Sequence, residues 1–64
     1  MEANEETAFR FQQRAEEIRV IASSTKDAGV RALLLRLAAD YEAIVETLER
    51  IERAERHIRQ REFL

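Results

Sequence analysis

The residues that could do chemistry in this chain are few and scattered. His57 is the single histidine and there is no cysteine, so neither paired imidazoles nor thiolates are present to hold zinc. Four carboxylates invite comparison with a metal site in a helical bundle: Glu16, Glu17, Asp40 and Glu42. Such a site also needs a Glu-x-x-His pair, which the sequence lacks. We therefore predict no catalytic residue, no cofactor and no metal, and we expect a protein that is not an enzyme.

Two further features are explained first by structure, as a hydrogen bond in the core and a solvated helix, and only second by binding. Tyr41 lies within an apolar ladder, so we expect a buried ring whose hydroxyl hydrogen-bonds to Arg14 or Glu17 of an earlier helix. Arginines recur near the end of the chain, at Arg50, Arg53, Arg56, Arg59 and Arg61. They could contact phosphate or the acidic groove of a protein, although a spacing of three winds around a helix instead of making one basic face. Neither a helix-turn-helix nor an aromatic platform accompanies these arginines. Nucleic-acid binding through this segment is therefore only the alternative to a protein–protein interaction function.

Two apolar ladders define the elements that position these residues. The first consists of Ala8, Phe11, Ala15, Ile18 and Ala22, and the second of Val30, Leu34, Leu37, Tyr41, Ile44, Leu48 and Ile51. Steps of three and four put such residues on one stripe of a helix. We predict a single domain over 1–64 with an all-α fold, a two-helix antiparallel hairpin of the coiled-coil type. The short helix 1 covers about 5–22, the loop 23–27 and the long helix 2 about 28–61.

Local residue types mark the helix ends. Asn4 is a suitable N-cap for the first helix, since acids follow it in the first turn. Ser23 begins a short run of hydroxyl residues that favours a helix end. The second helix starts either at a capping box formed by Ser24 and Asp27 or at Asp27 acting alone as the N-cap.

The two predicted helices differ in length. At about 1.5 Å per residue they measure roughly 27 to 30 Å and 45 to 50 Å, so about ten to fifteen residues of the second helix extend past the first. Four successive Glu-to-Arg pairs at i,i+4 support this overhang by about 0.2 to 0.5 kcal/mol each. Its end is either a frayed tail or a segment that docks on a second subunit or another protein. The candidate partner-binding residues are Arg53, Arg56, Arg59, Phe63 and Leu64.

Self-association is the expected source of stability. A chain of 64 residues without cysteine or metal ligands buries little surface, while 45% of its residues are hydrophobic. Apolar residues outside a two-helix seam broaden the second helix: Leu33, Leu35, Ala38 and Val45. We therefore predict a homodimer that forms a four-helix bundle, with tetramers and a similar heteromeric partner as open alternatives. The predicted contact residues are Leu33, Leu37, Tyr41, Ile44, Leu48 and Ile51.

Charge and hydropathy set the expected location. The net charge is −2, which indicates neither nucleic acid nor an anionic membrane as a partner on bulk grounds. No segment approaches the roughly 20 apolar residues of a membrane span, and the acidic start differs from a signal peptide. We expect a cytoplasmic protein that does not bind membranes and whose surface binds itself and an unidentified protein partner.

Several stretches resemble a known group of proteins. The matching residues are Arg14–Arg19 (RAEEIR), Asp27, Arg31, Leu34–Ala38 (LLRLA) and Asp40–Glu42 (DYE). They are similar to short helical-hairpin proteins of alphaproteobacteria, especially rhizobia, with the pattern R-A-E-E-x-R, a D-P-E turn and L-L-x-x-A-x-x-Y-E. Ala28 and Gly29 stand where that group has the proline and acid. The resemblance implies a bacterial cytoplasmic hairpin and transfers no functional residue.

Overall fold

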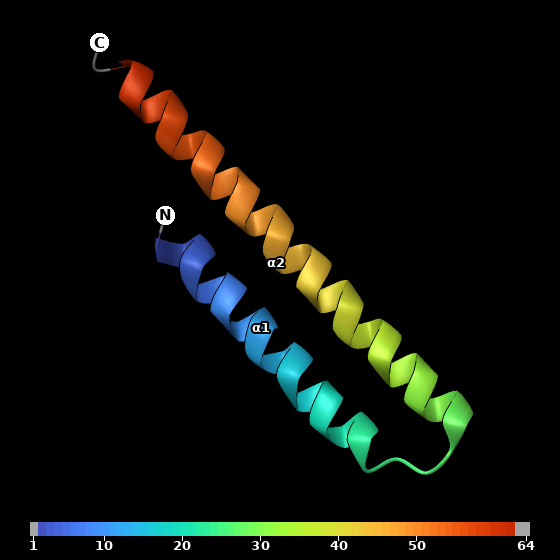
Figure 1. The fold of residues 1–64 in the computed structure, drawn as a ribbon. Helices are drawn as coiled ribbons and strands as arrows, with labels where there is room; N and C mark the ends of the chain where they lie inside the picture. Colours follow the sequence, from blue (N-terminus) through green and yellow to red (C-terminus); the bar gives the residue numbers. More distant parts are fainter. Residues whose placement is uncertain (1, 63–64) are drawn as a thin grey trace.

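The chain folds as an antiparallel helical hairpin in a computed structural model that describes residues 2–62 (Figure 1). Helix α1 spans Glu2–Ser23 and helix α2 spans Ala28–Glu62. The predicted all-α hairpin with a short first and a long second helix is thereby confirmed. Because α1 has 22 residues and α2 has 35, the end of α2 extends past the start of α1 by about 20 Å.

The start of α1 differs from the prediction. The helix begins at Glu2 rather than near residue 5, so Asn4 lies inside the helix and is not its N-cap. Asparagine costs only a few tenths of a kcal/mol in a helix, and no proline or glycine precedes it to stop the helix from extending. Glu5 and Glu6 remain close to the start, where the helix dipole favours negative charge.

Hydroxyl side chains end α1. The Ser23 hydroxyl donates a hydrogen bond to the Val20 carbonyl at 2.6 Å. The hydroxyls of Ser24 and Thr25 both donate to the Ile21 carbonyl, at 3.1 and 2.7 Å. These bonds satisfy carbonyls that a helix end leaves open, and no residue in the described part has a positive φ. The helix therefore ends without a glycine cap.

Asp27 starts α2. Its carboxylate oxygen Oδ1 accepts a hydrogen bond from the Val30 amide at 3.0 Å, and its carbonyl accepts one from the Arg31 amide at 2.9 Å. Since the Ser24 hydroxyl bonds back to α1, Asp27 acts alone as the N-cap, as the second of the two predictions for this end proposed. The Arg31 guanidinium also donates to the Thr25 carbonyl at 2.9 Å, which ties α2 to the loop.

The core is a narrow seam between the two helices. Its buried apolar residues are Ala15, Ile18, Ala22, Ala38 and Val45. Leu34 and Tyr41 of α2 pack against this cluster and are partly buried. Three of the five buried residues are alanines, so the helices approach closely but remove little apolar surface from water.

The position of the seam on α2 corrects one prediction. Ala38 and Val45, which the sequence suggests broaden α2 outside the seam, are buried inside it at 1% and 7% exposure. The seam follows residues 34, 38, 41, 45 and 48, which step by four and three just as the predicted ladder does. Ala38 lies in the seam because the backbone of α1 at Ala15 comes close, and the larger Leu37 is turned to the edge.

The hairpin is a single layer of helices. Its Cα atoms span 57 × 16 × 11 Å, so it is only one helix thick in its smallest dimension. Domains usually pack two or more layers around a core. Here both faces of the seam are open to solvent, and the larger apolar side chains at its edge remain exposed.

Candidate functional site

Six large apolar side chains form an exposed line along α2, which we call the apolar stripe. They are Val30, Leu33, Leu37, Ile44, Ile51 and Ile58, and they are 41% to 67% exposed. All except Leu33 recur every seven residues, a spacing that keeps side chains on one slowly drifting line of a helix. The apolar stripe therefore runs from the first turn of α2 into the segment that extends past α1.

The structure brings the six predicted contact residues together on one side of α2. Four of them belong to the apolar stripe. The other two, Tyr41 and Leu48, are half-buried against α1 and lie at the edge of the stripe. Residues three and four apart are neighbours on a helix, so Tyr41 lies directly between Leu37 and Ile44. The candidate surface is continuous with the seam of the hairpin.

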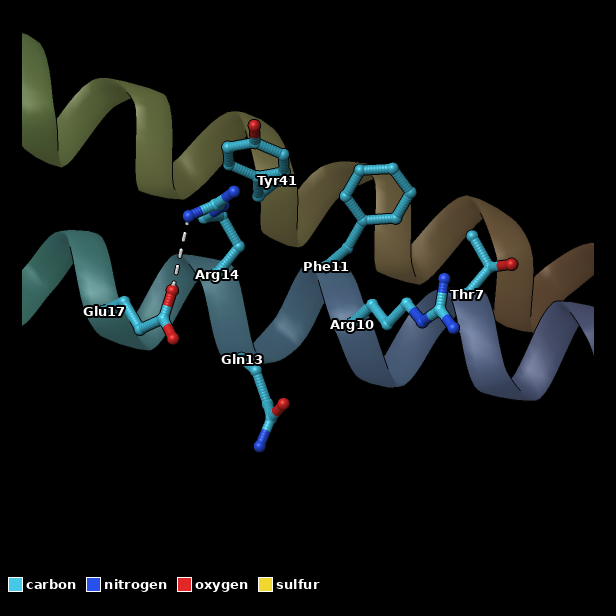
Figure 2. Close-up of a pocket in the computed structure, with 7 residues that line it drawn as sticks. All are labelled: Thr7, Arg10, Phe11, Gln13, Arg14, Glu17 and Tyr41. Carbon is cyan, nitrogen blue, oxygen red and sulfur yellow. Dashed lines mark hydrogen bonds and ion pairs between the residues drawn. The ribbon is translucent and has the colours of Figure 1, made fainter.

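An open hollow lies where this surface meets α1 (Figure 2). It is lined by Thr7, Arg10, Phe11, Gln13, Arg14, Glu17 and Tyr41. The rings of Phe11 and Tyr41 lie with centroids 5.4 Å apart at an interplanar angle of 32°. Their contact joins the helices at the rim of the seam.

The expected hydrogen bond of the Tyr41 hydroxyl to α1 is not what the structure shows. Arg14 donates to Glu17 at 3.5 Å, so the two predicted partners pair with each other. In Figure 2 the hydroxyl points away from both of them. Tyr41 is at the edge of a one-layer fold, so its hydroxyl reaches outward while its ring packs on Phe11.

The opposite side of the seam is polar and acidic. A second hollow there is lined by Gln12, Glu42, Val45, Glu46 and Glu49. Arg19 of α1 forms an ion pair with Glu42 of α2 across the helices. The hairpin thus has an apolar side and an acidic side. Sequence reasoning missed this ion pair, because it depends on the rotation of α2 that puts Ala38 and Val45 in the seam.

The arginines of the predicted partner-binding tail do not make a uniform basic surface. Arg53, Arg56 and Arg59 are all exposed. Arg53 and Arg56 line a hollow together with the carboxylates of Glu5, Glu49 and Glu52. Negative charge therefore interrupts the positive charge where α1 begins.

Other predicted site features have the following positions. Phe63 and Leu64 lie outside the described residues. His57 is exposed on the overhanging part of α2. Within residues 2–62, no group of three or more His, Cys, Asp or Glu side chains is arranged to hold a metal ion. Neither described helix is long and apolar enough to cross a membrane.

The comparisons with known proteins returned no relative. No family model matches the chain, and no curated protein and no solved structure is significantly similar to it. The functional conclusion therefore depends on the hairpin and its exposed surfaces.

Proposed function

We propose that this protein is a small, non-enzymatic protein–protein interaction module that self-associates as a homodimer. Two hairpins pack through their apolar stripes and form a four-helix bundle. The observation that carries this proposal is the exposure of Leu37, Ile44 and Ile51 in a line on one side of the hairpin. A continuous exposed apolar surface on a small protein marks an interaction site.

The poor core of the single hairpin supports a second copy as the occupant. Three of its five buried apolar residues are alanines, whereas the exposed large apolar side chains include six on the apolar stripe alone. A chain of 64 residues with so small a core normally needs a further source of stability. A second hairpin supplies the missing layer and buries the same patch on both subunits.

The available surface is large enough for a stable dimer. A standard interface buries about 800 Å² per partner. The described surface totals 5362 Å², so such an interface takes about one seventh of it. The apolar stripe, which runs from Val30 to Ile58 of α2, would form the apolar centre of such an interface.

We also infer a bacterial cytoplasmic setting, which the resemblance to alphaproteobacterial hairpins supports. Affinity capture from the native cell would identify any further protein partner. Nucleic-acid binding by Arg53, Arg56 and Arg59 receives less support, because carboxylates of α1 and α2 border the first two of them. A salt-dependent shift of DNA or RNA that disappears when all three become Glu would favour that alternative.

The test compares two substitutions on α2. Ile44→Glu puts a carboxylate in the middle of the apolar stripe. Leu35→Glu makes the same kind of change at a similarly exposed position, 47% against 41%, outside the stripe. Sedimentation equilibrium measures the mass of each variant and of the parent protein over a range of concentrations.

We expect the parent and Leu35→Glu to sediment as dimers and Ile44→Glu as a monomer. Two carboxylates enter the dimer interface in Ile44→Glu, and burial of unpaired charge should weaken association by more than about 100-fold. Mass is measured independently of helicity, so a variant that loses structure with its partner is still informative. A monomeric parent protein, or equal masses for all three proteins, would refute the proposal.

A further inference from the structure

We infer that α1 forms part of the dimer interface, so that the surface that packs against a second copy spans both helices of the hairpin. This inference rests on the proposed homodimer and adds to its interface the side chains of Phe11 and Ile21. The alternative is a dimer held by the two α2 helices alone, with each α1 on the outside. Three observations favour the two-helix surface: the contact made by Phe11, the side of α1 on which Ile21 lies, and the size that a stable interface needs.

Phe11 joins α1 to the apolar stripe. Its ring centroid lies 5.4 Å from that of Tyr41, which in turn lies between Leu37 and Ile44 on α2. The Phe11 side chain is only half-buried by this contact. The exposed apolar surface of α2 therefore continues onto α1 at this level of the hairpin.

Ile21 lies on the same side of α1 as the apolar stripe, and it is 54% exposed. It follows Arg14 by seven residues, and Arg14 follows Thr7 by seven, so the three side chains share one line of the helix. Thr7 and Arg14 both line the hollow beside Tyr41. The line that contains Ile21 therefore faces the same side as this hollow.

The hairpin also puts Ile21 level with the start of the apolar stripe. Phe11 contacts Tyr41, and both helices rise by about 1.5 Å per residue. Ten residues closer to the loop, Ile21 is therefore level with residue 31 of α2. Two exposed members of the stripe flank that level, Val30 and Leu33. Near the loop, exposed apolar side chains are thus present on both helices.

The polar residue between Phe11 and Ile21 does not prevent this packing. The Arg14 guanidinium pairs with the Glu17 carboxylate at 3.5 Å, and both side chains are more than 60% exposed. Interfaces surround an apolar centre with such polar groups at the rim. Because Glu17 balances the charge of Arg14, a second copy does not have to neutralise it.

Exposure alone does not define the surface, as Val20 shows. Val20 is 67% exposed, more than Ile21. It follows Gln13 by seven residues, and the Gln13 side chain points away from α2 in Figure 2. Val20 therefore lies on the outer side of α1, away from the stripe. Single apolar residues on a protein surface are ordinary and need no partner.

The size of a stable interface favours the use of both helices. A standard interface takes about 20 to 30 residues from each partner. About a third of the residues of a helix face any one side, which gives about 12 of the 35 residues of α2 and about 7 of the 22 of α1. α2 alone falls well short of the standard size, whereas the two helices together come close to it.

The test introduces a carboxylate at two adjacent positions of α1 in the full chain. Ile21→Glu puts it on the inferred surface, and Val20→Glu puts it on the outer side with the same change of net charge. Ile21→Ala and Val20→Ala remove side-chain carbons and raise the helix propensity, so they keep the hairpin helical. Sedimentation equilibrium over a range of concentrations gives the dimer dissociation constant of each variant, and circular dichroism measures its helix content.

We expect Ile21→Glu to raise the dimer dissociation constant by more than about tenfold, because two carboxylates lose water without gaining a partner. Ile21→Ala should raise it by about threefold or more, since apolar contact is lost in both subunits. The two Val20 variants should stay within about twofold of the parent protein, as expected for substitutions at an open surface.

Two results would overturn the inference and leave the homodimer standing. In the first, Ile44→Glu is monomeric while both Ile21 variants dimerise as the parent protein does, so the α2 helices hold the dimer alone. In the second, the Val20 variants weaken the dimer as much as the Ile21 variants. A parent protein that is monomeric at every concentration refutes the homodimer itself.

Discussion

At the scale of single residues, Asp27 has the clearest structural role. One residue serves the start of α2 twice, since its side chain accepts from the Val30 amide and its carbonyl accepts from the Arg31 amide. The overhang and the apolar stripe both belong to this helix. The residue at which α2 begins therefore depends on the Asp27 cap. The surfaces that α2 positions lie many turns away from this cap.

Replacing Asp27 by alanine should lower the free energy of unfolding by about 1 kcal/mol, because the Val30 amide loses its acceptor. Asp27→Asn keeps a side-chain oxygen at the same place and should cost only a few tenths of a kcal/mol. Urea titration followed by circular dichroism, at one fixed protein concentration, measures both variants. Equal destabilisation by the two substitutions would show that the negative charge, rather than the cap, is what matters.

At the scale of elements, the alanine-rich seam determines how α2 is rotated. Ala15 and Ala38 are almost fully buried, at 0% and 1% exposure. Their small side chains let the helices come close, and the rotation that brings Ala38 inward turns Leu37 and Ile44 toward the edge. The apolar stripe is thus a consequence of how the seam packs.

Ala38→Leu should destabilise the hairpin by about 1 to 3 kcal/mol, since the seam has no space for three additional carbon atoms. Ala39→Leu is the matched control, because Ala39 is the next residue on the same helix and is exposed. The control should change stability by less than about 0.5 kcal/mol. Thermal unfolding at one concentration measures both, and an equal effect would contradict a tightly packed seam.

The sequence pattern was sufficient to predict the hairpin and its unequal helices, and the predicted loop 23–27 contains the observed connection 24–27. Steps of three and four occur only on helices, and hydroxyl residues before Asp27 mark the break. The sequence pattern could not decide whether Leu37 or Ala38 lies in the seam, because either residue completes a ladder with Leu34 and Tyr41. Only the close approach of α1 decides between them. The ion pair between Arg19 and Glu42 has the same origin.

At the scale of the whole molecule, the hairpin is a single layer of helices with no second layer packed against it. The apolar stripe lies on one side of the seam, and the carboxylates of Glu42, Glu46 and Glu49 lie on the other. We therefore propose that the stripe is the surface that packs against another hairpin. In the dimer that we propose, a second copy would turn exposed side chains into a core, and the dimer rather than the single chain would be the folding unit.

Unfolding should therefore depend on protein concentration. Diluting the protein 100-fold should lower the apparent free energy of unfolding by about 2.7 kcal/mol per mole of dimer, with a lower thermal midpoint. Scanning calorimetry for the concentrated sample and circular dichroism for the dilute one cover this range. An unchanged midpoint across the series would indicate a self-sufficient monomer.

The short connection between the helices has a kinetic consequence. Only residues 24–27 separate α1 from α2, and most contacts lie within the helices, although pairs such as Phe11 and Tyr41 join residues 30 apart. Helical proteins dominated by local contacts fold in microseconds to milliseconds. For the dimer that we propose, the encounter of two copies would be the slow step in a dilute solution, and refolding would be second order in protein. The abundance of the protein in its cell would then control how quickly new chains reach their final form.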